Sequence, residues 1–217
     1  MRILILTQYY PPEIGAAQNR LSGLANFLKA AGHTVTVLTA LPNYPKGKIY
    51  DGYKNRLMVS EIKEGITIIR TWLYTKQNLQ FVGRLIHYLS FSILALLVSV
   101  FKVGRQDIVI TECPPLFAGI AGWLISKMKK AKFALNVSDL WTDSAVDLGM
   151  LKNGTLISLA LDLEKFLYQH AHLITGQTQG IVDSIRSRVF HTPVALITNG
   201  VDQDCFTRTE AKLARTR

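Results

Sequence analysis

The sequence predicts an α/β domain with a Rossmann-like parallel sheet of about seven strands and helices on both faces. Short apolar runs alternate with amphipathic helical patterns along the chain, which is typical of parallel strands joined by crossover helices. Over 217 residues the expected strands recur about every 31 residues, a normal length for one strand-and-helix unit. Apolar residues make up 48% of the chain and charged residues 18%, which excludes a disordered or fibrous protein.

The first forty residues predict a strand, a loop, a helix and a second strand. Ile3–Leu6 is long enough for a buried strand and too short for the core of a secretory signal. Pro11 and Pro12 end this strand, because proline donates no ladder hydrogen bond. Gly32 follows the expected helix as a left-handed cap, and Val35–Leu38 is the second strand. The helix is indicated by an apolar stripe at i, i+3, i+4 and i+7, namely Leu21, Leu24, Ala25 and Leu28.

The rest of the chain continues this alternation without an internal repeat or a low-complexity linker, so we expect one domain. Further strands are expected at Ile66–Thr71, Asp107–Thr111, Lys132–Asn136, Leu173–Thr175 and Val194–Ile197. Further helices are expected at Arg84–Val103, Leu116–Lys130, Gly154–His170 and Gln179–Phe190. Residues 42–63 are rich in Pro, Gly, Tyr and Lys, and we expect them to form a long irregular surface loop.

The balance of charges is strongly basic. Lysine and arginine outnumber aspartate and glutamate by 25 to 15, which gives a net charge of +10 and favours nucleic acid, anionic lipid or phosphorylated substrates as partners. Nucleic acid is disfavoured, because the aromatic residues are not interleaved with Lys and Arg and no known nucleic-acid-binding motif is present. Cys113 and Cys205 form no CxxC pair, which indicates a cytosolic protein without structural zinc.

Ligands of parallel α/β sheets bind beyond the carboxyl ends of the strands, so the loops at those ends are the candidates. The first of them contains neither GxGxxG nor GxxxxGK[ST], which argues against a dinucleotide or P-loop nucleotide site. Gly15 is the only glycine between Leu6 and Leu21 and stands just before the expected helix. The free N–H groups of that helix terminus favour an anion, but Gly15 could equally serve only the turn.

Asp139 follows the expected strand Lys132–Asn136 and should point into the same crevice. Its carboxylate could orient a hydroxyl, act as a base or stabilise positive charge, or it could only cap a short helix. Asp139, Asp143 and Asp147 are spaced by four, a pattern that more often gives a solvated helix face than a Mg²⁺ site. Cys113 has no visible base nearby, which argues against a nucleophile.

The segment from Leu85 to Phe101 is apolar nearly all round. As a helix it would reach roughly 25 Å, short of the ~30 Å hydrocarbon core, so a membrane span is disfavoured. Burial against the sheet and partial insertion into a membrane surface both remain open. Basic residues that could meet anionic headgroups flank it or follow in the chain, although lysines also favour helix C-termini. They are Arg84, Lys102, Lys127, Lys129 and Lys130.

Several motifs occur in an order that resembles one family. They are QYYPPEIGAAQNRLSGLA (residues 8–25), GHTV (32–35), LTALPNYPKGKIYDGY (38–53), SDLWTDSAVDLGML (138–151) and TNGVD (198–202). The resemblance extends over essentially all 217 residues. The motifs resemble the N-terminal domain of family-4 glycosyltransferases, in particular bacterial enzymes of O-antigen, capsule and colanic-acid assembly.

The resemblance implies a GT-B fold, in which two Rossmann-like domains face a cleft. Residues 1–202 would be the acceptor-binding domain, and the acceptor would be a polyprenyl-diphosphate-linked sugar at the cytoplasmic face of the plasma membrane. A C-terminal domain would bind the nucleotide-sugar that donates a hexosyl group. The family implies no metal or other cofactor.

The resemblance also suggests roles for individual residues. Gly15 and Ala16 would approach the donor phosphate and the transferred sugar, although many relatives carry a second glycine where this chain has Ala16. Asp139 would face the reacting sugar, as the catalytic residue. Asn19 and Arg20 would touch acceptor or phosphate, and Asn199 lies in the motif that closes the domain.

The family's donor site uses two glutamates eight positions apart, and no two glutamates of this sequence have that spacing. We therefore expect residues 203–217 to be a charged tail or the start of a linker, with the donor domain absent. The alternative function is a non-catalytic, membrane-associated binding module, indicated by the apolar segment and the basic charge.

Overall fold

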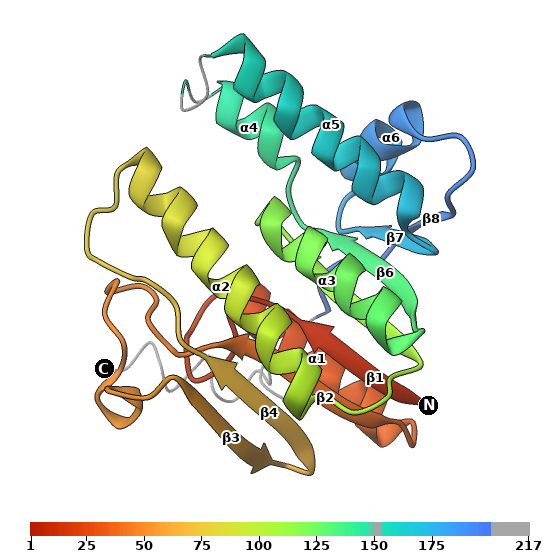
Figure 1. Ribbon diagram of the computed structural model, residues 1–217. Coiled ribbons are helices and arrows are strands. Elements are labelled where there is room, and N and C mark those ends of the chain that lie inside the picture. The colour runs from red at the N-terminus through yellow and green to blue at the C-terminus, as the bar shows by residue number, and fades with distance from the viewer. Residues whose placement is uncertain (148, 150–152, 201–217) are drawn as a thin grey trace, which may run out of the picture.

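The computed structural model describes residues 1–147, 149 and 153–200. One sheet of eight strands in the order β3-β4-β2-β1-β5-β6-β7-β8 forms the centre (Figure 1). The strands are β1 (Arg2–Leu6), β2 (Thr34–Ala40), β3 (Met58–Lys63), β4 (Ile66–Thr71), β5 (Ile108–Cys113), β6 (Lys132–Val137), β7 (Leu173–Gly176) and β8 (Val194–Leu196). The helices are α1 (Ala16–Ala30), α2 (Phe81–Lys102), α3 (Leu116–Lys129), α4 (Trp141–Asp147), α5 (Gly154–His170) and α6 (Gln179–Arg188), with a short 3₁₀ helix at Asp51–Tyr53.

The predicted parallel sheet is confirmed, with one addition at its edge. All neighbouring strands run parallel except β3 and β4, which form an antiparallel hairpin. The expectation that residues 42–63 form only an irregular loop is therefore wrong for the last six of them. Glu64 and Gly65 both have left-handed φ angles, 52° and 74°, which suit a tight two-residue hairpin turn. The remaining predicted boundaries agree with the structure to within three residues.

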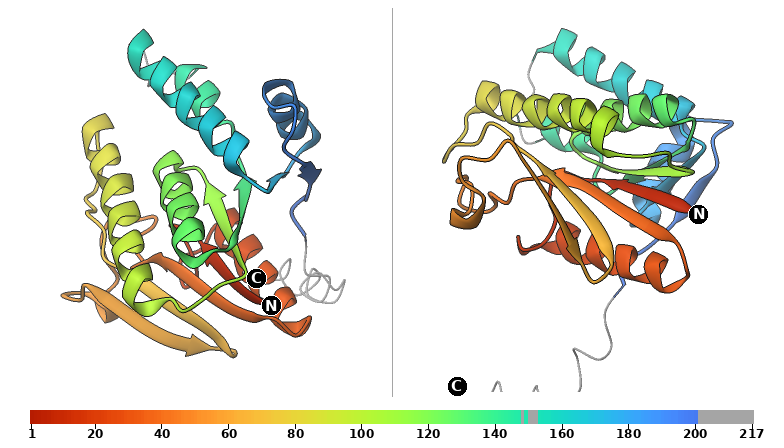
Figure 2. Two further views of the ribbon diagram at one scale, coloured as in Figure 1. Left: turned by 45° about the vertical axis from the view of Figure 1, so that its right-hand side comes forward. Right: turned by 60° about the horizontal axis from the view of Figure 1, so that its bottom comes forward.

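Alternate side chains of the strands pack against opposite layers of helices. Leu4 and Leu6 of β1 join Phe91 of α2 in one buried cluster, whereas Ile5 joins Leu21 of α1 in another. The right-hand view of Figure 2 shows α2, α3 and α5 on one side of the sheet and α1 on the other. Both faces of the sheet are therefore buried under helices, which confirms the prediction from the sequence.

Helix α2 buries polar residues beside Phe91 and Ala95 and presents an apolar face to solvent. His87, Ser92 and Ser99 are buried, and the two serine hydroxyls donate to carbonyls of their own helix. We define the outer face of α2 as a stripe of residues that are between 42% and 82% exposed. They are Val82, Ile86, Leu89, Ile93, Leu97, Val100 and Phe101. Among the described residues, α2 is the helix with the length and composition to cross a membrane, and 28% of its most apolar stretch is buried.

Glycines 122 and 23 should respond to alanine in opposite directions. A Cβ at Gly122 of α3 would lie 1.9 Å from Oγ1 of Thr111, a fully buried residue of β5, so helix and strand must separate. We expect Gly122→Ala to lower the free energy of unfolding by about 2 kcal/mol. A Cβ at exposed Gly23 of α1 meets nothing within 4 Å. Gly23→Ala should therefore raise the free energy of unfolding by about 0.5–1 kcal/mol. Urea denaturation of both variants tests this, and two shifts of equal sign would contradict the packing described.

Candidate functional site

A row of polar side chains crosses the sheet near the carboxyl ends of three strands. Glu112 of β5 is in register with Asn136 of β6, and Asn136 with Thr175 of β7. Asn136 Nδ2 donates to Glu112 Oε2 over 2.5 Å, and Thr175 Oγ1 donates to Asn136 Oδ1 over 2.7 Å. All three side chains are buried. We refer to Glu112, Asn136 and Thr175 as the polar row.

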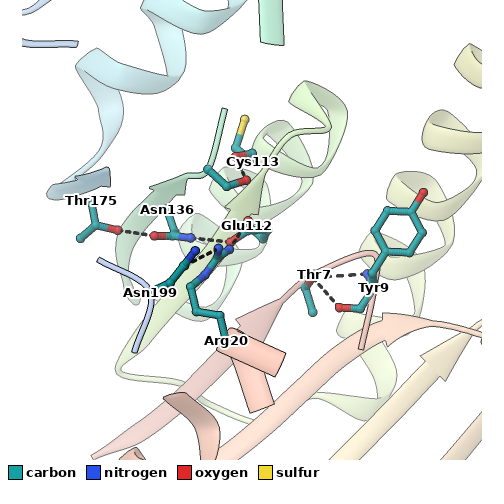
Figure 3. Close-up of polar contacts among 9 residues, drawn as sticks. Thr7, Tyr9, Arg20, Glu112, Cys113, Asn136, Thr175 and Asn199 are labelled. Carbon is teal, nitrogen blue, oxygen red and sulfur yellow. Dashed lines mark hydrogen bonds and ion pairs between the residues drawn. The ribbon is translucent and has the colours of Figure 1, made fainter. Parts of the chain in front are cut away.

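Arg20 of α1 connects the polar row to the opposite layer of the protein. Its Nη2 forms an ion pair of 2.5 Å with Glu112 Oε1, and its Nη1 donates to Asn199 Oδ1 over 3.2 Å (Figure 3). The side chains of Arg20 and Glu112 are only 11% and 5% exposed. Arg20 Nε is buried without a hydrogen-bond partner in the protein. The structure therefore brings together two of the residues predicted from the sequence, Arg20 and Asn199, around a glutamate that was not predicted.

The other predicted residues of the first loop lie at the start of the same helix. Gly15 immediately precedes α1 in an extended conformation, with φ 173°. A Cβ there would lie 2.5 Å from the side-chain amide oxygen of Gln18. Glycine at this position therefore allows the Gln18 side chain to lie close to the backbone. Ala16 and Asn19 are exposed in the first turns of α1. The N-terminus of the helix thus lies one turn from Arg20, and both offer positive electrostatic potential to an anion.

Glu13 ties the loop after β1 to the loop after β2. Its carboxylate is buried and accepts backbone N–H groups from Tyr10, Asn43 and Tyr44 over 3.3, 2.7 and 2.8 Å. Burial raises the pKa of Glu13 above its usual range, while the three N–H donors act in the opposite direction. The carboxylate thus holds both loops in place.

His87 of α2 also holds the loop after β1, through a hydrogen bond to Gln8. Its Nδ1 donates to the carbonyl of Tyr74 over 2.7 Å, because a carbonyl can only accept. Its Nε2 is then free of hydrogen in the neutral ring and accepts from Gln8 Nε2 over 2.6 Å. Burial lowers the pKa of His87, which favours this neutral form.

Asp139 lies in the loop after β6, as predicted, and is exposed. Its Oδ1 accepts a hydrogen bond of 3.0 Å from the hydroxyl of Ser144 in α4. Asp143 is paired instead with Arg188 of α6. Within the described part of the chain, no group of three or more His, Cys, Asp or Glu residues is placed to hold a metal ion. Cys113 is buried, and burial raises the pKa of its thiol, which disfavours a nucleophilic thiolate.

The basic residues assigned to a membrane or acceptor surface do not form one group. Arg84 is in the first turn of α2 and Lys102 is its last residue, about 27 Å away along the helix. Lys127 and Lys130 are exposed at the end of α3, and Lys129 Nζ donates to the carbonyl of Val103 over 2.5 Å. Arg84 therefore lies at the carboxyl side of the sheet, and the lysines lie at the amino side.

The polar row was missed by sequence reasoning, although a weak signal was present. Glu112, Asn136 and Thr175 are polar residues next to the last position of strands that are otherwise mostly apolar. Such a residue, placed at the carboxyl end of a buried strand, indicates a site. Residues Val201 and Asp202 of the closing motif, Cys205 and the expected tail 203–217 lie outside the described residues.

Comparison with known proteins identifies the family of this chain and a relative with a similar sequence. The model of the family described as "Glycosyl transferase 4-like domain" matches residues 15–200. The chain is 27% identical over 169 residues to the protein named "Putative colanic acid biosynthesis glycosyl transferase WcaI" of Escherichia coli K12. That match covers 76% of this chain and 41% of the relative.

Solved structures share the fold at low sequence identity. Sucrose-phosphate synthase of Thermosynechococcus elongatus superimposes with a TM-score of 0.63 at 14% identity, over all of this chain and 52% of that protein. Anabaena HepE in complex with UDP-glucose gives 0.58 at 14% identity, over all of this chain and 49% of HepE. The catalytic domain of starch synthase IV from Arabidopsis thaliana gives 0.57 at 15% identity, over 94% of this chain and 52% of that one. The chain thus spans about half the length of the proteins it matches, and the predicted Rossmann-like domain of a GT-B fold is confirmed.

The buried pair of Arg20 and Glu112 should be important for stability. Glu112→Gln keeps the shape of the side chain but leaves the guanidinium buried without its counter-charge. We expect the free energy of unfolding to fall by about 3 kcal/mol, as for other broken buried pairs. Asp51→Asn, which breaks the exposed pair of Asp51 with Lys54, serves as control and should cause no measurable change. Equal effects of the two changes in chemical denaturation would contradict a structural role of the pair.

Proposed function

This chain belongs to the glycosyl transferase 4-like domain family, and on that premise we propose that it binds the acceptor in the transfer of a hexosyl group from a nucleotide-sugar. The observation that best supports this is the cluster of Arg20, Asn199 and the polar row beside the N-terminus of α1. These groups lie at the carboxyl edge of the sheet, where parallel α/β folds bind ligands.

We propose roles for the individual groups at this edge. Gly15, Ala16 and the N-terminus of α1 face the donor phosphate, because free N–H groups and the helix dipole stabilise an anion. Arg20 and Asn19 contact phosphate or acceptor, and Asn199 helps to hold Arg20. Asp139 faces the reacting sugar, since it is exposed after β6 and its carboxylate keeps acceptor capacity beyond the hydrogen bond that it accepts from Ser144. No metal or other cofactor takes part in this proposal.

The acceptor in this proposal is a polyprenyl-diphosphate-linked sugar of a bacterial surface polysaccharide. The similarity to a relative named for colanic acid biosynthesis supports that setting. The donor site is proposed to lie on a second domain, because this chain corresponds to about half of the proteins it matches. Transfer then requires both domains.

We propose further that the domain is peripheral on the cytoplasmic face of the plasma membrane. The outer face of α2 presents apolar side chains to solvent along the whole helix, and the net charge of +10 favours an anionic surface. The same observation favours the second candidate function, a non-catalytic module that binds membranes. The two candidates differ in whether sugar transfer occurs.

Sugar transfer should depend on Asp139. With a nucleotide-sugar-binding domain supplied, the chain should transfer sugar to a polyprenyl-diphosphate-linked acceptor, and Asp139→Ala should lower turnover about 100-fold or more. The melting temperature should hardly change, because Asp139 is exposed. Asp162→Ala, at an exposed position of α5, is the matched control and should keep full turnover. An inactive but folded two-domain enzyme would refute transfer, and an unchanged rate in Asp139→Ala would remove that residue from the site.

Membrane binding should depend on the outer face of α2. The chain should sediment with vesicles that contain phosphatidylglycerol, less so at high salt. The double change Ile93→Gln and Leu97→Gln should weaken binding about tenfold through lost apolar burial. Leu57→Gln alters a residue that is 75% exposed outside α2 and should have no effect. Sedimentation without any dependence on anionic lipid, or equal losses in both variants, would refute this location.

A further inference from the structure

A pocket of about 230 Å³ lies between the first turns of α2 and the short helix α4. From α2 it is lined by Phe81, Arg84, Leu85 and Tyr88, and from α4 by Trp141 and Ala145. Helix α2 follows the carboxyl end of β4, and α4 follows that of β6 (Figure 1). The residues that line the pocket therefore lie at the same edge of the sheet as the polar row. Trp141 is two residues after Asp139.

The walls of the pocket combine aromatic and aliphatic surface with one cation. Three rings, from Phe81, Tyr88 and Trp141, line it together with the isobutyl group of Leu85. Arg84 Nε donates to the carbonyl of Leu79 over 3.2 Å, which directs this side chain along the pocket. Burial raises the pKa values of Tyr9 and Tyr88, and the charge of nearby Arg84 acts in the opposite direction. An apolar pocket beside a guanidinium group suits a ligand with a hydrocarbon chain and an anionic head.

The outer face of α2 begins where the pocket lies. Val82 and Ile86 alternate along the helix with the pocket residues Phe81, Arg84 and Leu85, and are 66% and 48% exposed. Apolar surface therefore continues from the pocket along the helix. This face would guide a hydrocarbon chain from a bilayer toward the pocket.

We propose that this pocket binds the first isoprenoid units of the polyprenyl diphosphate that carries the acceptor sugar, with Arg84 beside the diphosphate group. This inference rests on the proposed function, since it places the lipid part of the acceptor. A pocket of about 230 Å³ has room for part of a single chain, which favours an isoprenoid over a phospholipid with two acyl chains. The flat walls formed by the three aromatic rings suit the planar double bonds of such a chain. The phosphate end then points toward the edge that carries Asp139 and Arg20.

Farnesyl phosphate, kept below the concentration at which it aggregates, is the probe for this site. Calorimetric titration into the chain without vesicles should show saturable binding, and farnesol, which lacks the phosphate, should bind more weakly. Leu85→Gln and Phe81→Ala should each weaken farnesyl phosphate binding about tenfold or more. Phe81 is 37% exposed, so its truncation tests the pocket even if Leu85→Gln impairs folding. Arg84→Gln should weaken binding of farnesyl phosphate but not of farnesol.

Leu159→Gln is the matched control, because Leu159 of α5 is 65% exposed and does not line the pocket. It should leave farnesyl phosphate binding unchanged. The proposal is overturned if farnesyl phosphate does not saturate, if both pocket variants bind normally, or if Leu159→Gln causes the same loss. Equally tight binding of dihexanoyl phosphatidylglycerol at the same residues would also overturn it, in favour of a phospholipid site.

The transfer assay separates failure of this inference from failure of the proposed function. If the two-domain enzyme glycosylates a lipid-linked acceptor and both Leu85→Gln and Phe81→Ala do so at the normal rate and KM, the pocket is not the lipid site although the function stands. If farnesyl phosphate binds with the expected variant pattern but no sugar is transferred, the binding site stands and the proposed function fails.

Discussion

The ion pair between Arg20 and Glu112 joins the two layers that form the ligand-binding edge. Arg20 comes from α1 on one side of the sheet, and Glu112 is next to the last residue of the central strand β5. Removing both charges from water is costly, and hydrogen bonds to the other polar atoms of the pair offset part of that cost. Asn136 bonds the second oxygen of Glu112, and Asn199 accepts a hydrogen bond from the guanidinium group. The pair therefore fixes a positive charge beside the N-terminus of α1.

The first loop at this edge is held at two points by buried polar groups. Glu13 accepts three backbone N–H groups and so connects the loop to the segment after β2. Gln8, at the start of the loop, donates to the neutral ring of His87 in α2. A site with its loops fixed before a ligand arrives loses less entropy on binding. This explains why α2 carries a buried histidine although most of its residues are apolar.

Helix α2 links the two regions of proposed function. Its inner face has small and polar residues such as Ser92 and Ser99, which allow a close approach to the sheet. The apolar residues that a core helix would bury form its outer face instead. A helix of this kind exposes apolar surface that a soluble monomer rarely leaves uncovered. Its first turns meet α4 at the carboxyl edge, so the same helix borders both the outer apolar surface and the candidate site.

The sequence by itself determined the order of strands and helices, because local periodicity and turn residues control each element. Positions after buried strands pointed to Gly15 and Asp139, since such residues face the ligand crevice, and the family resemblance pointed to Arg20. Sequence reasoning missed β3, an edge strand whose pairing depends on a turn at Glu64 and Gly65. Only the tertiary structure brought Arg20 to Glu112, 92 residues later in the chain, and set the register of the polar row. Such contacts depend on crossover connections and strand register, which no local pattern in the chain encodes.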